Sequence, residues 1–133
     1  MNQSIVYIAN SIVPSRAANS MHVMKMCSAF GSLGHRVRLI VRSMPAEEIP
    51  DVDPFPFYGV PQGFALEKLE PTPLVWNKTI FAWRAASRAA AEEAGLVYSR
   101  SLSASSLSAW RGIPVIYESH TPERGQASER LYA

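Results

Sequence analysis

The chain has 133 residues, of which 47% are hydrophobic and 18% charged, as in a single globular domain. Its net charge of +2 is too small to indicate a nucleic-acid partner, and its single cysteine, Cys27, excludes an internal disulfide framework. The opening Met1–Ser4 has neither the basic segment nor the long apolar run of a signal peptide or membrane span, so we expect a cytoplasmic protein.

The first third of the chain predicts a strand, a helix and a second strand. Ser4–Ala9 is a short apolar run rich in β-branched residues, as in strands that are buried on both faces of a parallel sheet. Asn19 or Ser20 can cap a helix whose apolar residues recur every three or four positions until Gly34 stops it. Arg36–Arg42 predicts the second strand, which completes a βαβ unit with a right-handed crossover.

The middle of the chain is rich in proline. Ser43–Pro73 holds seven of the ten prolines, so long regular elements are not expected there, and Phe64–Leu69 is the best strand candidate within it. Trp76–Ala94 is the strongest predicted helix, because it is rich in alanine and is followed by Gly95.

Strands and helices alternate to the end of the sequence. Leu96–Ser99 and Val115–Glu118 predict strands around a helix at Leu102–Arg111, and a last helix is expected from Thr121. This alternation predicts an α/β, Rossmann-like domain: an open, mainly parallel sheet with helices on both faces. Four strands are expected to be central, namely Ile5–Ile8, Val37–Val41, Leu96–Ser99 and Val115–Tyr117.

Ligands of such sheets bind beyond the carboxyl ends of the strands, which directs attention to two segments. The loop that follows the first strand leads into a helix N-terminus, where free amides attract anions and Ser15, Arg16 and Asn19 could reinforce that attraction. His120 follows the last strand and could donate to a ligand oxygen. An ordinary solvated loop and a histidine that caps backbone groups are the alternatives.

Several site types are not supported by the sequence. The first strand is not followed by Gly-x-Gly-x-x-Gly, there is no P-loop, and no aspartate follows a strand, which argues against nicotinamide enzymes and receiver domains. Asp51-Val52-Asp53 matches a pattern with which some sugar transferases hold a divalent metal. Prolines flank it in a loop, however, so we expect no metal site.

One helical stripe allows two interpretations. Trp76, Ile80 and Trp83 share a face of the predicted long helix, with Arg84 and Arg88 beside it. Aromatic and basic residues arranged in this way are typical of helices that lie on a membrane surface. A core-facing helix shows the same stripe, and core packing is the favoured interpretation.

The order of several segments resembles a known family, the retaining glycosyltransferases of family 4. The similarity covers nearly the whole chain but only the amino-terminal half of that family. It is carried by Ile5–Ser11, Pro14-Ser15, His22–Phe30, Leu33–Val37, Phe57–Val60, Leu96–Arg100 and Gly112–His120.

The resemblance implies one lobe of a GT-B enzyme, in which two Rossmann-like lobes face each other across a cleft. Residues 1–133 would be the acceptor-side lobe, inactive alone, with the donor-binding lobe absent from this chain. The implied partners are a nucleotide-sugar donor and a glycan or lipid-linked acceptor, with no nucleic acid and with peripheral contact at the inner face of the membrane. Neither a cofactor nor a metal is implied.

The resemblance also suggests roles for individual residues. His120 matches the family histidine that approaches the donor sugar, and Arg100 matches a basic position after the fourth strand. Ser15, Arg16 and Asn19 lie in the loop that lines the cleft, although the family's two glycines are missing there, which favours side-chain contact by Arg16. The alternatives are a non-catalytic binding module, the acceptor-holding subunit of a two-chain transferase, or an unrelated Rossmann-like regulatory domain.

Overall fold

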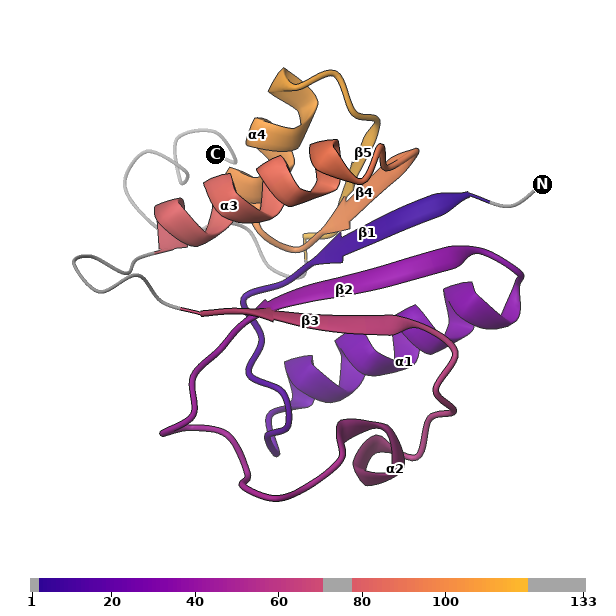
Figure 1. Cartoon of the computed structure of the whole chain (residues 1–133), viewed down its shortest axis with the longest axis vertical. Coiled ribbons are helices and arrows are strands. Elements are labelled where there is room, and N and C mark those ends of the chain that lie inside the picture. Colours follow the sequence, from indigo (N-terminus) through magenta and orange to yellow (C-terminus); the bar gives the residue numbers. More distant parts are fainter. Residues whose placement is uncertain (1–2, 71–77, 120–133) are drawn as a thin grey trace, which may run out of the picture.

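The computed structural model describes residues 3–70 and 78–119, which form a five-stranded parallel sheet in the order β3-β2-β1-β4-β5 (Figure 1). Every neighbouring pair of strands is parallel, so the predicted α/β, Rossmann-like sheet is confirmed. The strands are β1 (Ser4–Ile8), β2 (Arg36–Arg42), β3 (Ala65–Leu69), β4 (Leu96–Ser99) and β5 (Val115–Tyr117).

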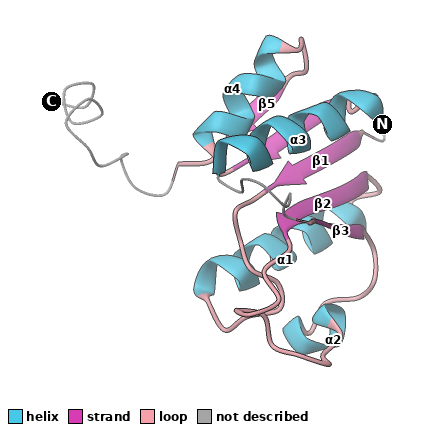
Figure 2. Ribbon diagram, turned by 60° about the vertical axis from the view of Figure 1, so that its left-hand side comes forward, coloured by secondary structure: helices cyan, strands magenta, loops and turns pink. Residues whose placement is uncertain are grey.

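Helices cover both faces of the sheet, as predicted. On one face lie α1 (Ala18–Ser32) and the short α2 (Pro54–Tyr58), and on the other lie α3 (Lys78–Ala91) and α4 (Leu102–Trp110) (Figure 2). The crossovers through these helices are what allow neighbouring strands to run parallel.

The alternation of side chains along β1 divides the hydrophobic core between the two faces. Ile5 and Tyr7 pack with α1, including its buried Cys27. Val6 and Ile8 pack on the opposite face against α3. A strand covered on both sides must be apolar throughout, which is why this run could be predicted from the sequence.

The start of α1 differs from the prediction. The helix begins at Ala18 after Ala17, and no side chain caps it. Ser20 already lies inside the helix, where its hydroxyl donates to the main-chain oxygen of Ile12 at 2.6 Å. Asn19 is exposed. The predicted cap at Asn19 or Ser20 is therefore wrong, because the serine hydroxyl holds the preceding loop and not the first helical amides.

Two predictions about the later elements are also wrong. Among the described residues β5 pairs only with β4, so Val115–Tyr117 is an edge strand and not a central one. The helix α3 ends at Ala91 and not at Ala94, since Glu93 adopts a left-handed conformation with φ of 54° that a helix cannot continue through. Trp76 and the segment from Thr121 lie outside the described residues.

The orientation of α3 overturns the core interpretation of its tryptophan stripe. Trp83 is 55% exposed. The helix instead presents Phe81 and small residues to the sheet, and these are completely buried: Phe81, Ala82, Ala85, Ala86 and Ala89. Alanine lets the helix backbone approach the sheet closely, which places the bulky indole on the outer side.

Within the described part of the proline-rich segment, residues 43–70, one short helix precedes β3. Asp53 precedes α2 and accepts a hydrogen bond from the amide of Phe55 at 3.1 Å, and Gly59, with φ of 69°, ends the helix in the left-handed conformation. One carboxylate of the Asp-x-Asp pattern thus caps a helix. Within residues 3–70 and 78–119, no group of three histidine, cysteine or acidic side chains could hold a metal.

Candidate functional site

A charged cluster lies at the carboxyl edge of the sheet, where β4 and β5 end beside α1. Glu118, which directly follows β5, is at the centre of this cluster. Its Oε1 lies 2.8 Å from His22 Nε2 and 3.5 Å from Arg100 Nε. Its Oε2 accepts a hydrogen bond from the hydroxyl of Tyr98. An imidazole from α1, a phenol from β4 and a guanidinium from the loop after β4 thus converge on one carboxylate.

We call His22, Tyr98, Arg100 and Glu118 the edge cluster. The side chains of Arg100 and Glu118 are only 21% and 19% exposed, so water screens their interaction weakly. Nε is the only nitrogen of Arg100 with a partner among the described residues. Its two terminal nitrogens therefore remain to donate to an anion, for which the planar guanidinium is well shaped.

Two tyrosines form the floor of the edge cluster. Tyr7 of β1 lies beside Tyr98 of β4, with ring centroids 4.9 Å apart. Burial, together with the hydrogen bond to Glu118, raises the pKa of Tyr98 to about 12. Burial and the nearby Glu118 carboxylate also raise the pKa of Tyr7. Both phenols therefore remain protonated at neutral pH, and Tyr98 can act as a donor to the cluster.

Polar atoms without partners lie at the same edge, at the ends of β1 and β2. Asn10 Oδ1 and Arg42 Nε are buried and have no hydrogen-bond partner among the described residues. The two strands are neighbours, and the amide of Ala9 still donates to Ile40 at 3.1 Å, so the register places Asn10 beside Arg42. Buried polar groups are normally satisfied, and these two mark a place where a polar ligand or water would bind.

The first loop is held by contacts within the protein. The amide of Ser15 donates to the Tyr58 hydroxyl at 2.8 Å, and that hydroxyl donates back to the Ser15 carbonyl at 2.7 Å. The side chains of Ser15 and Ser20 lie 2.9 Å apart. The loop thus has a fixed conformation that is set by α2, a contact between residues 43 positions apart.

The structure separates the predicted site residues into three groups. Arg100 lies in the edge cluster, and Ser15 belongs to the loop network. Arg16 and Asn19 are exposed at the start of α1, and Arg16 forms no hydrogen bond or ion pair with the described part of the chain. His120 lies outside the described residues, so its role stays a prediction.

The sequence did not identify three members of the edge cluster. His22 falls within the predicted first helix, and Tyr98 and Glu118 fall within predicted strands. A weak signal is present, since Glu118 is an acidic residue at the last position of a predicted strand, close to where ligand-binding groups of parallel sheets are found. Its contact with His22, 96 residues earlier, depends on the strand order and could not be read from spacing.

A hollow in the described part of the chain lies at the opposite edge, where the strands begin. It measures about 870 Å³ and is lined in part by Ser4, Arg36 and Gln62. Two of its charged side chains, Arg38 and Glu92, already pair with each other at 2.8 Å. Since ligands of open parallel sheets bind beyond the carboxyl ends of the strands, the edge cluster is the stronger candidate site.

Among solved structures, the chain is similar to a glycosyltransferase from Rickettsia africae, with a TM-score of 0.60 and 11% sequence identity. The match covers 98% of this chain but 33% of the Rickettsia protein, so the chain spans about a third of that enzyme's length. At this identity the likeness shows a glycosyltransferase-like fold.

Two further structures are similar at lower scores. The C-terminal domain of a hydrogenase from Pyrococcus furiosus has a TM-score of 0.49 at 11% identity, covering 88% of this chain and 91% of that domain. A universal stress protein from Burkholderia pseudomallei has a TM-score of 0.45 at 14% identity, covering 87% and 96%. Neither carries an argument about function. No family model and no curated protein matches the chain.

No helix within residues 3–70 and 78–119 combines the length and the apolar character that are needed to cross a bilayer.

The two tyrosines of the floor predict a contrast in stability. Tyr98→Phe is expected to lower the free energy of unfolding at pH 7 by about 1–2 kcal/mol, because the Glu118 carboxylate loses a donor. Tyr7→Phe should change it by less than about 0.5 kcal/mol, since the Tyr7 hydroxyl has no partner among the described residues. Urea denaturation of both variants measures the difference, and equal losses would contradict the described hydrogen bonding.

The raised pKa of Tyr98 predicts that the protein loses stability at alkaline pH. The folded state holds the Tyr98 proton until its pKa of about 12, whereas the unfolded chain releases it near 10.0. The contribution of the protonated Tyr98 to the free energy of unfolding is therefore complete below pH 10 and is lost as the pH rises toward 12. Urea denaturation of Tyr98→Phe across this range should show a shallower decline than that of the wild type, and an unchanged slope would contradict the shift.

Proposed function

We propose that this chain is the acceptor-side lobe of a retaining glycosyltransferase, which moves a sugar from a nucleotide-sugar donor to an acceptor hydroxyl. The observation that carries the proposal is the edge cluster, an arginine and a histidine oriented by one carboxylate at the ligand-binding edge of a glycosyltransferase-like fold. The family resemblance of the sequence supports the same assignment.

The residues of the edge suit the chemistry of a phosphorylated sugar and a hydroxyl acceptor. Arg100 can donate two hydrogen bonds to phosphate oxygens, which carry the charge that develops on a leaving diphosphate. Asn10 and Arg42 offer a buried acceptor and a buried donor to hydroxyl groups. Glu118 already contacts three side chains, so its part is to position His22 and Arg100 and not to attack the sugar.

Other parts of the proposal rest on the resemblance alone. His120 would approach the donor sugar as the catalytic residue, and Arg16, Asn19 and Ser15 would line the substrate side of the first loop. The donor nucleotide would be held by a second lobe, so residues 1–133 alone should transfer no sugar. Retention means that the acceptor attacks from the face that the diphosphate leaves.

The proposal is tested on the natural protein that carries this sequence, isolated from its own cells through an affinity tag. We expect it to transfer a sugar from one of a panel of UDP-, GDP- and ADP-sugars, with retained anomeric configuration in the NMR spectrum of the product. Arg100→Gln should lower kcat/KM about 100-fold, the usual cost of one transition-state donor.

A matched control is Arg36→Gln, because Arg36 is exposed at the start of β2, far from this edge along the strand. It should leave kcat/KM unchanged. The absence of transfer with every donor, or an Arg100→Gln protein with wild-type kinetics, would refute the proposal. If transfer requires a separate chain that co-purifies, the acceptor-holding subunit of a two-chain transferase replaces the single-chain enzyme.

A further inference from the structure

The last residue of β2 is an arginine that the described part of the chain leaves without a partner. Arg42 is half-buried, its Nε is buried, and no group within residues 3–70 and 78–119 accepts a hydrogen bond from that nitrogen. The other half-buried arginines of the described chain each contact an oxygen atom, a glutamate for Arg38 and Arg100 and a main-chain carbonyl for Arg84. Because a buried guanidinium without a counter-charge is destabilising, Arg42 indicates a site for an anion.

The surroundings of Arg42 strengthen its attraction for an anion. Side chains alternate along β2, so Arg42 lies on the same face as Ile40, which is completely buried in one cluster with Phe81 of α3. Leu69, which pairs with Arg42 across β2 and β3, is buried in the same cluster. Apolar neighbours screen a charge less than water does, so an anion is held more strongly here than at an exposed arginine.

Asn10 offers a second buried atom on the same face. Ile8 of β1 belongs to the cluster under α3, and Asn10 follows it by two residues, which is one full alternation of the side chains. The Oδ1 of Asn10 is buried and has no hydrogen-bond partner in the described part of the chain. A ligand that satisfies both residues must donate to Asn10 Oδ1 and accept from Arg42 Nε. A hydroxyl group beside a carboxylate or phosphate does both, and its negative charge pairs with the guanidinium.

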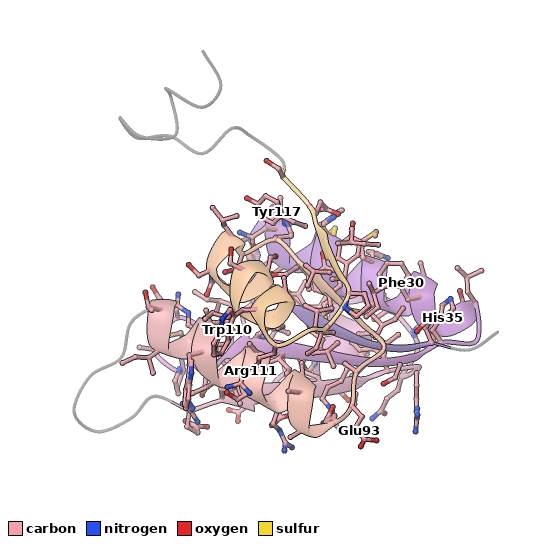
Figure 3. All side chains as sticks on the ribbon, turned by 90° about the horizontal axis from the view of Figure 1, so that it is seen from above. Phe30, His35, Glu93, Trp110, Arg111 and Tyr117 are labelled. Atoms are coloured by element: carbon pink, nitrogen blue, oxygen red, sulfur yellow. The ribbon has the colours of Figure 1, made fainter. Side chains whose placement is uncertain are left out.

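Asn10 and Arg42 lie on the other face of the sheet from the edge cluster. Tyr98 of the edge cluster packs on the α1 side, where the centroid of its ring is 5.4 Å from that of Phe30. Figure 3 shows Phe30 on this side and Arg111, which follows α4, on the opposite side. Both groups nevertheless lie at the carboxyl edge of the sheet. The strand order reverses there between β1 and β4, and open α/β sheets bind their ligands at such a point.

We propose that Arg42 and Asn10 select an acidic acceptor, which carries a carboxylate or phosphate beside a hydroxyl group. Arg42 Nε donates to an anionic oxygen of this acceptor, and Asn10 Oδ1 accepts from the hydroxyl. That the ligand is an acceptor rests on the proposed function, whereas the preference for an anion rests on the unpartnered atoms. A neutral acceptor would leave the charge of Arg42 unpaired and is therefore bound more weakly.

Binding of matched sugars to the natural protein that carries this sequence tests the proposal without sugar transfer. The probes are methyl hexosides that differ only at carbon 6, as the neutral alcohol, the carboxylate or the phosphate, each in the gluco, manno and galacto forms. NMR titration gives the Kd of each probe. At least one anionic probe should bind about tenfold or more tightly than its neutral counterpart, the range for hydrogen bonds to charged groups. The Kd values of the carboxylate and the phosphate show which anion the site prefers.

Variants of the two residues test whether this preference comes from the proposed site. Arg42→Gln should abolish the preference and leave the Kd of the neutral probe unchanged. Asn10→Asp should also abolish it, because the new carboxylate supplies the counter-charge from within the protein. Arg42→Lys should retain part of it, since the charge remains but the planar guanidinium is lost. The matched control is Arg36→Gln at the exposed start of the same strand, which should bind every probe as the wild type does.

Circular dichroism should show that all of these variants are folded. The absence of binding by every anionic probe, equal Kd values for neutral and anionic forms, or a preference that survives Arg42→Gln would overturn the proposal. Sugar transfer separates it from the proposed function. Transfer to neutral and acidic acceptors with equal kcat/KM would keep the transferase and refute the acidic acceptor. Binding of anionic probes through Arg42 without transfer to any of them would support the anion site and refute the transferase.

Discussion

Replacing Glu118 by glutamine is expected to lower the free energy of unfolding by about 2 kcal/mol, the range for hydrogen bonds to charged groups. The side-chain amide of the glutamine places an NH₂ group where one carboxylate oxygen of Glu118 now accepts a hydrogen bond. It also removes the negative charge beside Arg100, 3.5 Å away. The arginine then stays largely buried without a counter-charge, which costs more than the lost attraction itself. Urea denaturation with an unchanged m-value measures the loss.

The control for this variant is Glu47→Gln, because Glu47 is exposed and its side chain has no partner among the described residues. It should change the free energy of unfolding by less than about 0.5 kcal/mol. In a double-mutant cycle, Glu118→Gln and Arg100→Gln should be non-additive, since both remove one interaction. Additive losses would show that the carboxylate and the guanidinium do not act together, and the edge cluster would not exist as described.

The sheet could be predicted because a strand that is buried on both faces needs a run of apolar residues, which is visible in the sequence. Strand β1 appears as a nearly continuous apolar run and β2 contains the apolar run Leu39–Val41, and the two strands are confirmed as parallel neighbours. Strand β5 also has an apolar run, which is shorter, yet it lies at the edge of the described sheet. Its central residue Ile116 is 48% exposed, so a short apolar run shows neither that a strand is covered on both faces nor how many strands flank it.

The register of α3 could not be predicted, for a related reason. The sequence offers two apolar stripes on this helix, one marked by Trp83 and one built of Phe81 and alanines. Hydrophobicity favours the larger aromatic residues, whereas close packing of a helix on a sheet favours small ones. In the structure the stripe of Phe81 and alanines packs on the sheet, and Trp83 lies on the surface.

The edge cluster was beyond prediction because it depends on the order of strands. Arg100 could be placed at the ligand edge, since every parallel strand ends there. The order β1-β4-β5 then brings Glu118 beside Tyr98, and the crossover helix α1 brings His22 over them. Neither the strand order nor the helix rotation is encoded in any local pattern, so the contacts among these residues appear only in the folded chain.

Phe81→Ala is expected to lower the free energy of unfolding by about 3–5 kcal/mol, the usual cost of truncating a buried aromatic side chain. Phe81 is completely buried and packs on the sheet against Val6, Ile8 and Ile40. Alanine would leave a cavity under α3 that the small neighbouring alanines cannot fill. Since a domain of this size is stable by only about 5–15 kcal/mol, the variant should unfold at a much lower urea concentration.

The neighbouring Trp83→Ala variant makes this a test of the helix register. Trp83 is larger than Phe81 but 55% exposed, and the described contact that it would lose is with the Arg111 guanidinium. Its truncation should cost only about 0.5–1 kcal/mol, the range for an exposed cation–π contact. If Trp83 instead faced the core, as its hydrophobicity alone suggests, the two costs would be reversed. A larger loss for Trp83→Ala than for Phe81→Ala would therefore overturn the described register of α3.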